Sequence, residues 1–252
     1  MRKINLLAVD VGNTNISFGL FISGHLVTTF HIPTCTYNPG KIRNKLKKKA
    51  ADDAVICSVV PGLTNRIAKD LKAITGKLPY IIGKDIKVPL KNLYRKPNQV
   101  GEDRLVNAYA ATIIYGAPII AVDFGTAITF DVISGKKEYL GGMIIPGLKI
   151  SLEALHQRTA LLPLAKLEKP RDFIGRDTKN SMLSGIIYGF SSLTDDLIMR
   201  IRKAIGRNTL SIATGGNIRL ISRYCRQLDK VDINLTLKGL NMLYFNFNKK
   251  NT

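Results

Sequence analysis

The chain has 252 residues, 45% of them hydrophobic and 22% charged, and its 38 Lys and Arg against 18 Asp and Glu give a formal net charge of +20. This length and composition can bury a substantial core in one or two domains, which excludes an intrinsically disordered chain. No apolar run approaches the roughly 20 residues that span a bilayer, and Asp10 cuts short the N-terminal run of residues 4–9, so we expect a cytoplasmic protein without membrane partners.

Neither the cysteines nor the lysines indicate a specialised site. Cys35, Cys57 and Cys225 are odd in number and widely spaced, which indicates reduced thiols rather than a disulfide framework or a zinc site. The high net charge favours anionic partners such as nucleic acid. However, the basic residues are dispersed, and the densest run, residues 45–49, belongs to a segment with helical periodicity. We interpret that run as the solvated face of a helix and expect no specific nucleic-acid partner.

In chain order, the first half is predicted to begin with three antiparallel strands, followed by two helices around a buried strand and then a third helix. The strands come from apolar runs joined by short turns, and Ser23-Gly24 closes the second hairpin. Pro61 starts the second helix and Gly76 ends it. The predicted strands cover residues 4–10, 16–22, 26–32 and 54–59, and the predicted helices cover residues 40–50, 61–75 and 100–115.

The second half repeats this plan after a break at Gly116-Ala117-Pro118. Its strands are expected at residues 119–123, 128–133 and 139–145, and its helices after Pro146-Gly147, at 178–205 and at 237–247. In the long helix we assign apolar residues to the core, and Gly185 and Gly189 are expected to allow close packing. The assigned core residues are Met182, Ile186, Phe190, Leu193, Leu197 and Ile201. We predict two similar α/β domains, residues 1–116 and 117–252, facing each other across a nucleotide cleft.

The most informative feature is a glycine turn that occurs twice, each time after an apolar strand that delivers an aspartate. The copies are Asp10-Val-Gly-Asn-Thr-Asn-Ile-Ser17 and Asp123-Phe-Gly-Thr-Ala127. Glycine lets backbone amides approach a phosphate, the hydroxyls of Thr14 and Thr126 can donate to phosphate oxygens, and each carboxylate can hold a hydrated cation. A third glycine turn, residues 213–217, fits a nucleoside contact. One such motif is often only a turn, but three in this order predict a nucleotide site.

A charged segment, Gly101-Glu-Asp-Arg104, stands where a helix is predicted to begin. Core packing explains its charges poorly, which favours a role in chemistry. The alternative is structural, because Asp103 would meet the positive end of the helix dipole and Arg104 could form an ion pair on the surface. The residues by themselves leave both explanations open.

A set of segments, spread in order over nearly the whole chain, matches one known family. The segments are Tyr94 with Pro97, and residues 10–15, 101–104, 123–127, 141–147, 159–163, 174–178 and 235–240. In them the chain resembles the type III pantothenate kinases of the acetate and sugar kinase, Hsp70 and actin superfamily. The resemblance implies two ribonuclease H-like domains of the actin-like ATPase fold, each with a five-stranded mixed sheet. It also implies phosphorylation of pantothenate by ATP, the first step of coenzyme A biosynthesis.

The same resemblance implies roles for individual residues and a homodimer. Asp103 would be the general base that accepts the proton of the primary hydroxyl of pantothenate. Asp10 would help to hold Mg²⁺ with ATP, and Asp123 would bind a monovalent cation, K⁺ or NH₄⁺. The implied ATP-binding residues are Asp10, Val11, Gly12, Asn13, Thr14, Asn15, Ile16, Ser17 and Thr126, and the implied pantothenate-binding residues are Tyr94, Gly101, Glu102, Asp103, Arg104 and Thr178.

Simpler explanations stand beside two of these roles, because Tyr94 could be an ordinary half-buried aromatic residue and Thr178 could cap the helix that begins there. Two positions depart from the family, which usually has Asn at the position of Lys96 and often an acidic residue at that of Lys238. Both differences make this chain more basic. A regulatory or nucleic-acid-associated protein with weak or lost kinase activity therefore stays an alternative, as does a kinase for another small hydroxyl compound.

Overall fold

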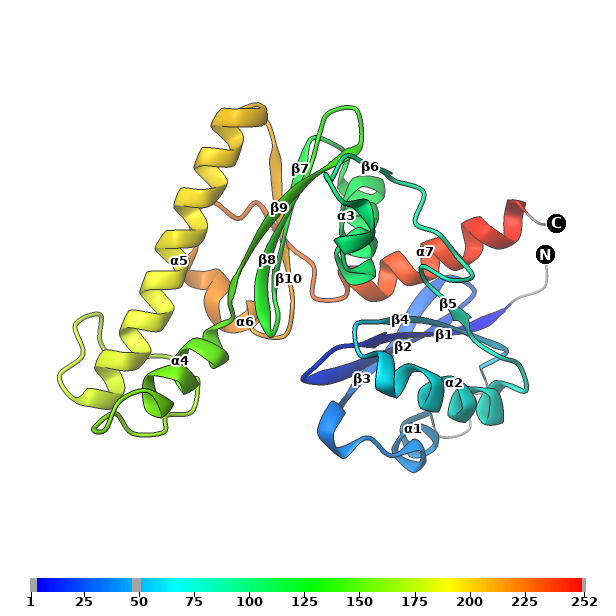
Figure 1. Cartoon of the computed structure of the whole chain (residues 1–252), viewed down its shortest axis with the longest axis horizontal. Coiled ribbons are helices and arrows are strands. Elements are labelled where there is room, and N and C mark those ends of the chain that lie inside the picture. The colour runs from blue at the N-terminus through cyan, green and yellow to red at the C-terminus, as the bar shows by residue number, and fades with distance from the viewer. Residues whose placement is uncertain (1–3, 47–50, 251–252) are drawn as a thin grey trace. The chain divides into compact units, whose positions relative to one another are not determined.

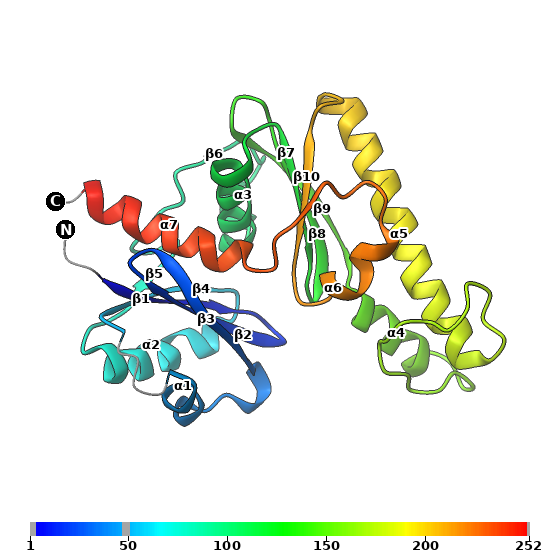
Figure 2. The same ribbon diagram turned by 180° about the vertical axis from the view of Figure 1, so that it is seen from behind.

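Residues 4–46 and 51–250 are described by a computed structural model of the chain (Figures 1 and 2). Their contacts divide them into two compact units. The first unit contains the described residues of Met1–Leu90, Lys96–Ala110 and Asn234–Thr252, and the second contains Lys91–Arg95 and Ala111–Ile233. Residues 47–50 of the predicted helix 40–50 lie outside the described part of the chain.

The first unit is built on a five-stranded sheet in the order β3-β2-β1-β4-β5. Its strands are β1 (Asn5–Val11), β2 (Asn15–Ile22), β3 (His25–Pro33), β4 (Asp53–Ser58) and β5 (Tyr80–Ile81). The first three form an antiparallel meander, whereas β4 and β5 extend the sheet in parallel on the other side of β1. Positive φ angles of 52° at Ser23 and 81° at Gly24 make the tight turn that the Ser-Gly pair predicted.

Helices cover both faces of this sheet. On one face, Leu7 and Val9 of β1 pack into the same core as α1 (Pro39–Leu46) and α2 (Pro61–Thr75). On the other face, Leu6 and Ala8 of β1 pack into a core shared with α3 (Glu102–Tyr115) and α7 (Leu235–Lys250) (Figure 1). Because both faces are covered, β1 is a continuous apolar run rather than an alternating one. The unit also contains two short 3₁₀ helices, η1 (Thr34–Thr36) and η2 (Pro97–Gln99).

The second unit repeats this topology around a six-stranded sheet of order β11-β10-β7-β8-β9-β6. Its meander consists of β7 (Ile119–Phe124), β8 (Ala127–Ile133) and β9 (Glu138–Pro146), and β10 (Leu210–Thr214) and β11 (Lys230–Val231) extend it in parallel beside β7. The duplication predicted from the two glycine turns is therefore confirmed in the strand order. A short strand, β6 (Lys91–Asn92), pairs with β9 and brings the sheet to six strands, one more than expected.

The helices of the second unit are α4 (Leu148–Gln157), α5 (Thr178–Ile205) and α6 (Ile218–Ile221), followed by the 3₁₀ helix η3 (Ser222–Tyr224). The bounds predicted for α5 are confirmed, and five of its six assigned core residues lie in or against the hydrophobic core. The assignment of Leu193 is wrong, because its side chain is 38% exposed. The close packing expected at Gly185 and Gly189 is wrong too, since a Cβ added at either would meet no atom within 4 Å. All three lie on the solvent-facing side of α5.

The predicted domain boundary between residues 116 and 117 stays a prediction. The compact units differ from it by assigning α7 to the first unit, where it packs on the sheet, and by dividing the chain inside α3. Among the described helices, none combines the length and the apolar character required to cross a membrane.

Candidate active site

The first glycine turn lies at the end of β1 and is held in place by hydrogen bonds to its backbone carbonyls. The Gly12 N–H donates to the Asn15 carbonyl (3.1 Å) and closes the turn. Thr34, which sequence reasoning missed, donates its hydroxyl to the Gly12 carbonyl (2.7 Å) and its N–H to the Thr14 carbonyl (3.0 Å). The side chains of Asn13, Thr14 and Asn15 are exposed. The turn is therefore a braced loop that presents polar groups to solvent, as a phosphate site requires.

Not every residue predicted to bind ATP can do so through its side chain. Val11 and Ile16 are fully buried in the core of the first unit, so only their backbone can face a ligand. Ser17 is half-buried, and its Oγ lies 3.1 Å from Nδ1 of His31. Asp10 is also half-buried, at the next-to-last position of β1.

Three carboxylates gather around one buried thiol in the first unit. Asp10 on β1 lies directly opposite Cys57 on the parallel strand β4. Burial raises the pKa of the Cys57 thiol well above its usual range, and the charges of Asp10, Asp103 and Glu102 raise it further. The strand register and the start of α3 thus bring the predicted magnesium ligand Asp10 and the predicted base Asp103 to the same end of the first sheet.

Asp103 carries features of both a helix cap and a general base. α3 begins at Glu102, and Asp103 folds back so closely that a Cβ on Gly101 would collide with its Oδ1. Burial raises the pKa of the Asp103 carboxyl, and this effect exceeds the lowering by the Arg104 backbone N–H, the Arg104 charge and its own N–H. The backbone contacts are those of a cap. A raised carboxyl pKa is what a general base near neutral pH needs.

The two neighbours of Asp103 are also withdrawn from water. Glu102 is half-buried against Gly83, where φ is 86° and an added Cβ would lie 2.6 Å from the Glu102 Oε1. Burial, followed by the charge of Asp103, raises the pKa of the Glu102 carboxyl. Arg104 is buried, with only 7% of its surface exposed. The surface ion pair considered for Arg104 is therefore wrong.

The second glycine turn lies at the end of β7 and is enclosed by two other glycine segments. The Gly147 N–H, just before α4, donates to the Thr126 carbonyl (3.1 Å), and a Cβ on Gly147 would collide with that oxygen. Gly215 has φ 99°, and a Cβ there would collide with Oδ1 of Asp123. Asn217 donates its N–H to the Phe124 carbonyl (3.1 Å). The structure thus brings the third glycine turn of the sequence against the second one, while Thr126 stays exposed.

Tyr94 and Thr178 belong to the second unit as well. Tyr94 is half-buried, its N–H donates to Oδ1 of Asn92 (2.9 Å), and its ring lies against Gly141. Thr178 is exposed at the first position of α5. The cap of that helix is Asp177, whose side chain accepts the Asn180 N–H (2.8 Å). Thr178 is therefore not needed as a cap, and the residue as a whole is exposed.

The described residues contain no group of three or more His, Cys, Asp or Glu side chains that could hold a metal ion by themselves. This donor set fits Mg²⁺ only as a partner of a bound nucleotide, because Mg²⁺ is commonly held by one or two carboxylates together with substrate phosphates and water. Asp10 offers such a carboxylate. Asp123, packed between Gly125 and Gly215, offers a hard oxygen donor of the kind that alkali cations accept.

Two copies of one mixed α/β topology, each with an aspartate-glycine turn after the first strand of its meander, define the actin-like ATPase fold. Solved structures agree with this class. A Campylobacter jejuni protein assigned to the Baf family of transcriptional activators has a TM-score of 0.60 at 21% identity, covering 96% of this chain and 99% of that chain. MreB 5 of Spiroplasma citri bound to AMPPNP has a TM-score of 0.54 at 10% identity, covering 99% and 98%. At these identities the likeness shows the fold alone.

Sequence comparison identifies the family within that class. Residues 6–200 match the family model for type III pantothenate kinase. The type III pantothenate kinase of Persephonella marina is 40% identical over 250 residues, which cover 95% of this chain and 98% of the relative. The chain belongs to the type III pantothenate kinase family.

Proposed function

We propose that this chain is a pantothenate kinase that transfers the terminal phosphoryl group of ATP to pantothenate. The products are 4'-phosphopantothenate and ADP, and the reaction opens coenzyme A biosynthesis. The observation that supports this most strongly is the 40% identity to a type III pantothenate kinase over 95% of the chain. The proposal for the individual residues rests on their geometry and on the resemblance of their motifs.

ATP binds to the two glycine turns. In the first, the exposed side chains and backbone amides of residues 12–15 contact the phosphates, and Asp10 holds Mg²⁺ through its carboxylate. When bound, the metal neutralises charge on the phosphate oxygens. In the second, Thr126 donates its hydroxyl to a phosphate, and Asp123 binds K⁺ or NH₄⁺. Val11 and Ile16 support ATP binding indirectly, because their buried side chains anchor the first turn in the core. Ser17, which is half-buried, lies at the edge of that turn.

Pantothenate is bound by Tyr94, Gly101, Glu102, Arg104 and Thr178, and Asp103 is the base. The primary hydroxyl oxygen attacks the terminal phosphorus, the bond to ADP breaks, and the hydroxyl proton passes to the Asp103 carboxylate. The buried guanidinium of Arg104 suits the substrate carboxylate, because it can donate two parallel N–H bonds. Phosphoryl transfer depends mainly on positioning and charge neutralisation, so we assign the base a contribution of about 10² to 10⁴ in rate.

The chain acts as a homodimer in the cytoplasm, without a specific nucleic-acid partner. Between α4 and α5 the second unit exposes four large apolar side chains, an arrangement that marks association surfaces. They are Leu161, Leu164, Phe173 and Ile174, each between 67% and 91% exposed. Sedimentation tests this: Ile174→Asp should convert a dimer into the 27.8 kDa chain, whereas Leu78→Asp, at a site 63% exposed in the first unit, should not. A wild-type chain that sediments only as a monomer would exclude the dimer.

One assay tests the activity. The purified chain is incubated with ATP, Mg²⁺ and pantothenate, with and without K⁺ or NH₄⁺, and 4'-phosphopantothenate is detected by mass spectrometry. We expect product that requires Mg²⁺ and a monovalent cation. Robust turnover without any monovalent cation would remove the role of Asp123, and no product under any condition would favour the regulatory alternative. The likeness to the Campylobacter jejuni protein does not favour the regulatory alternative, because at 21% identity it shows only a shared fold and not a shared role.

A further inference from the structure

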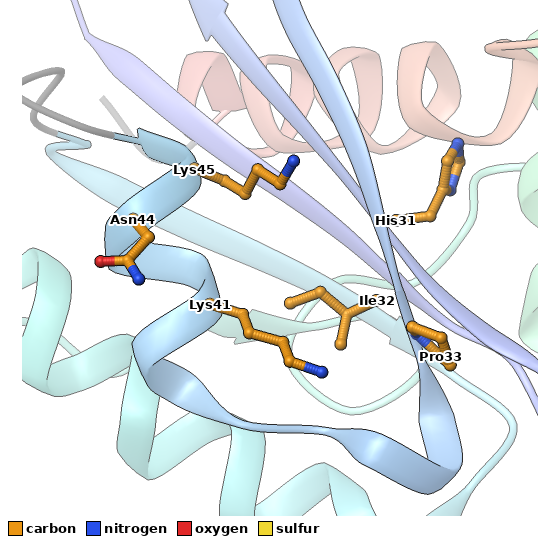
Figure 3. A pocket seen from close by; sticks show the side chains of 6 residues that line it. All are labelled: His31, Ile32, Pro33, Lys41, Asn44 and Lys45. Atoms are coloured by element: carbon orange, nitrogen blue, oxygen red, sulfur yellow. The ribbon is translucent and has the colours of Figure 1, made fainter.

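A cavity of about 540 Å³ opens in the first unit between the edge strand β3 and helix α1 (Figure 3). It is separate from the residues assigned above to ATP and pantothenate. Its volume lies within the range of about 300 to 1,000 Å³ typical of small-molecule sites. The lining residues are His31, Ile32, Pro33, Lys41, Asn44 and Lys45.

The lining favours an anion with an apolar portion. Lys41 and Lys45 stand one helical turn apart on α1, and Figure 3 shows both side chains reaching from the helix toward β3. Ile32 and Pro33 supply apolar contact, and none of the lining residues is a carboxylate. Burial lowers the pKa of the His31 imidazole, so His31 is neutral near pH 7. The positive charge of the cavity therefore comes from the two lysines.

Two hydrogen-bonded paths connect this cavity with the first glycine turn. In one, His31 Nδ1 lies 3.1 Å from Oγ of Ser17. In the other, the Lys41 ammonium donates to the carbonyl and the hydroxyl of Thr36 (3.1 and 3.3 Å) at the end of η1. Thr34, at the start of η1, holds the Gly12 and Thr14 carbonyls. A ligand that engages Lys41 thus acts on the segment that braces the phosphate turn.

We propose that the cavity is a regulatory site for a small polyanion, whose phosphate or carboxylate groups pair with Lys41 and Lys45. An anion that draws the Lys41 ammonium away from Thr36 loosens η1, and the Thr34 brace of the turn loosens with it. Occupancy therefore weakens ATP binding and leaves the phosphoryl-transfer step unchanged. The effect on ATP rests on the proposed function, whereas the binding itself does not.

Binding is tested by calorimetry on the full chain without nucleotide or Mg²⁺, at constant ionic strength. Citrate is the carboxylate probe and pyrophosphate the phosphate probe. The double variant Lys41→Gln and Lys45→Gln should bind at least about tenfold more weakly, since two charge-assisted contacts are lost. The matched control is Lys69→Gln with Lys72→Gln, two exposed lysines of α2, which should bind like wild type. Equal weakening in both double variants, or no saturable binding of either probe, would overturn the site.

The link to the turn is tested by kinetics at fixed free Mg²⁺, because citrate also chelates that ion. Citrate should raise the KM for ATP severalfold in wild type and in the α2 control, with kcat unchanged, and should have no effect on the Lys41 and Lys45 double variant. An equal response of all three proteins, or no change in KM, would refute the regulatory effect. A chain without kinase activity would leave the calorimetric result intact, so failure of the proposed function is recognised separately.

Discussion

At the scale of single residues, Asp103 has two possible roles, that of a helix cap and that of a general base. Its carboxylate accepts backbone N–H groups at the start of α3, which stabilises the charged form. Burial acts in the opposite direction and is the larger effect, so the pKa is raised. A carboxylate that served only as a cap would interact most favourably with the helix dipole if it were fully ionised on an exposed first turn. Burial of the charge is better explained by a base that must take up a proton.

The variant Asp103→Asn separates these two roles. We expect kcat to fall by about 10² or more, with little change in the KM for ATP, because Asn accepts hydrogen bonds but cannot accept the proton. Stability should not fall. Because folding raises the pKa of this carboxyl, its charged form lowers the free energy of unfolding at neutral pH, and this effect disappears below the unfolded-state pKa. Asn carries no charge, so the variant removes the effect. Steady-state kinetics and urea unfolding provide the measurements, and near wild-type kcat with unchanged circular dichroism would favour the cap.

The three cysteines should differ sharply in reactivity. Cys35 is exposed, whereas burial, followed by the charge of Asp195, raises the pKa of Cys225 to about 12. Cys57 is fully buried among carboxylates, which raise its pKa further. Because the thiolate is the reactive form, iodoacetamide at neutral pH should modify Cys35 first and leave Cys57 untouched until the chain unfolds. Peptide mass spectrometry after timed labelling measures this, and early modification of Cys57 would show that its surroundings open in solution.

At the scale of elements, glycines control how the site turns are built. Gly215→Ala should lower the free energy of unfolding by about 2 kcal/mol or more, because φ is positive and the methyl group would meet Asp123 and the Phe124 backbone. The same change should reduce the stimulation of activity by K⁺. Gly185→Ala is the control in the exposed face of α5, where the methyl group meets nothing, and should stabilise the chain by about 0.5 to 1 kcal/mol. Urea unfolding of both variants tests this, and equal destabilisation would contradict it.

Elements with strong local signals were predictable from the sequence. The bounds of α5 follow from its continuous apolar periodicity, and the N-terminal bound coincides with a side-chain cap at Asp177. The two-residue strands β5, β6 and β11 have no local pattern, so the sequence does not predict them. The predicted buried face of α5 is wrong at Leu193, which is exposed. Periodicity defines an apolar stripe along the helix but not which edge of the stripe is covered, and Leu193 lies at such an edge.

The candidate site was predictable in its motifs but not in its supports. The Asp-Gly turns are predictable because each follows an apolar strand. Asp103 is predictable because it belongs to a charged segment where a helix begins. The groups that brace them are distant in sequence: Thr34 for the first turn, Gly147 for the second and Gly83 beside Glu102. A threonine or glycine in a loop has many ordinary explanations. Only their contacts in the folded chain distinguish Thr34, Gly147 and Gly83 from ordinary loop residues.

At the scale of the whole molecule, the duplicated topology explains why each unit carries one aspartate turn. In both sheets the first strand of the meander is central, with a parallel strand beside it, so that its end is flanked by loops of the same unit. The first unit adds α3 with Asp103 near that end, and the second adds the turns at Gly147 and Gly215. The same strand order thus supports two different sets of chemical groups.

The net charge of +20 is the remaining property of the whole chain, and it leads to a prediction about nucleic acids. Because the basic residues are dispersed, contacts with DNA should be made with phosphates alone, and affinity should fall steeply and linearly on a log-log plot against salt. Fluorescence anisotropy with two duplexes of unrelated sequence should give equal affinities at each salt concentration, and the double change Lys69→Gln with Lys72→Gln should make the slope shallower. Binding that survives high salt and prefers one duplex would instead indicate base-specific contacts, and would restore the regulatory alternative for this chain.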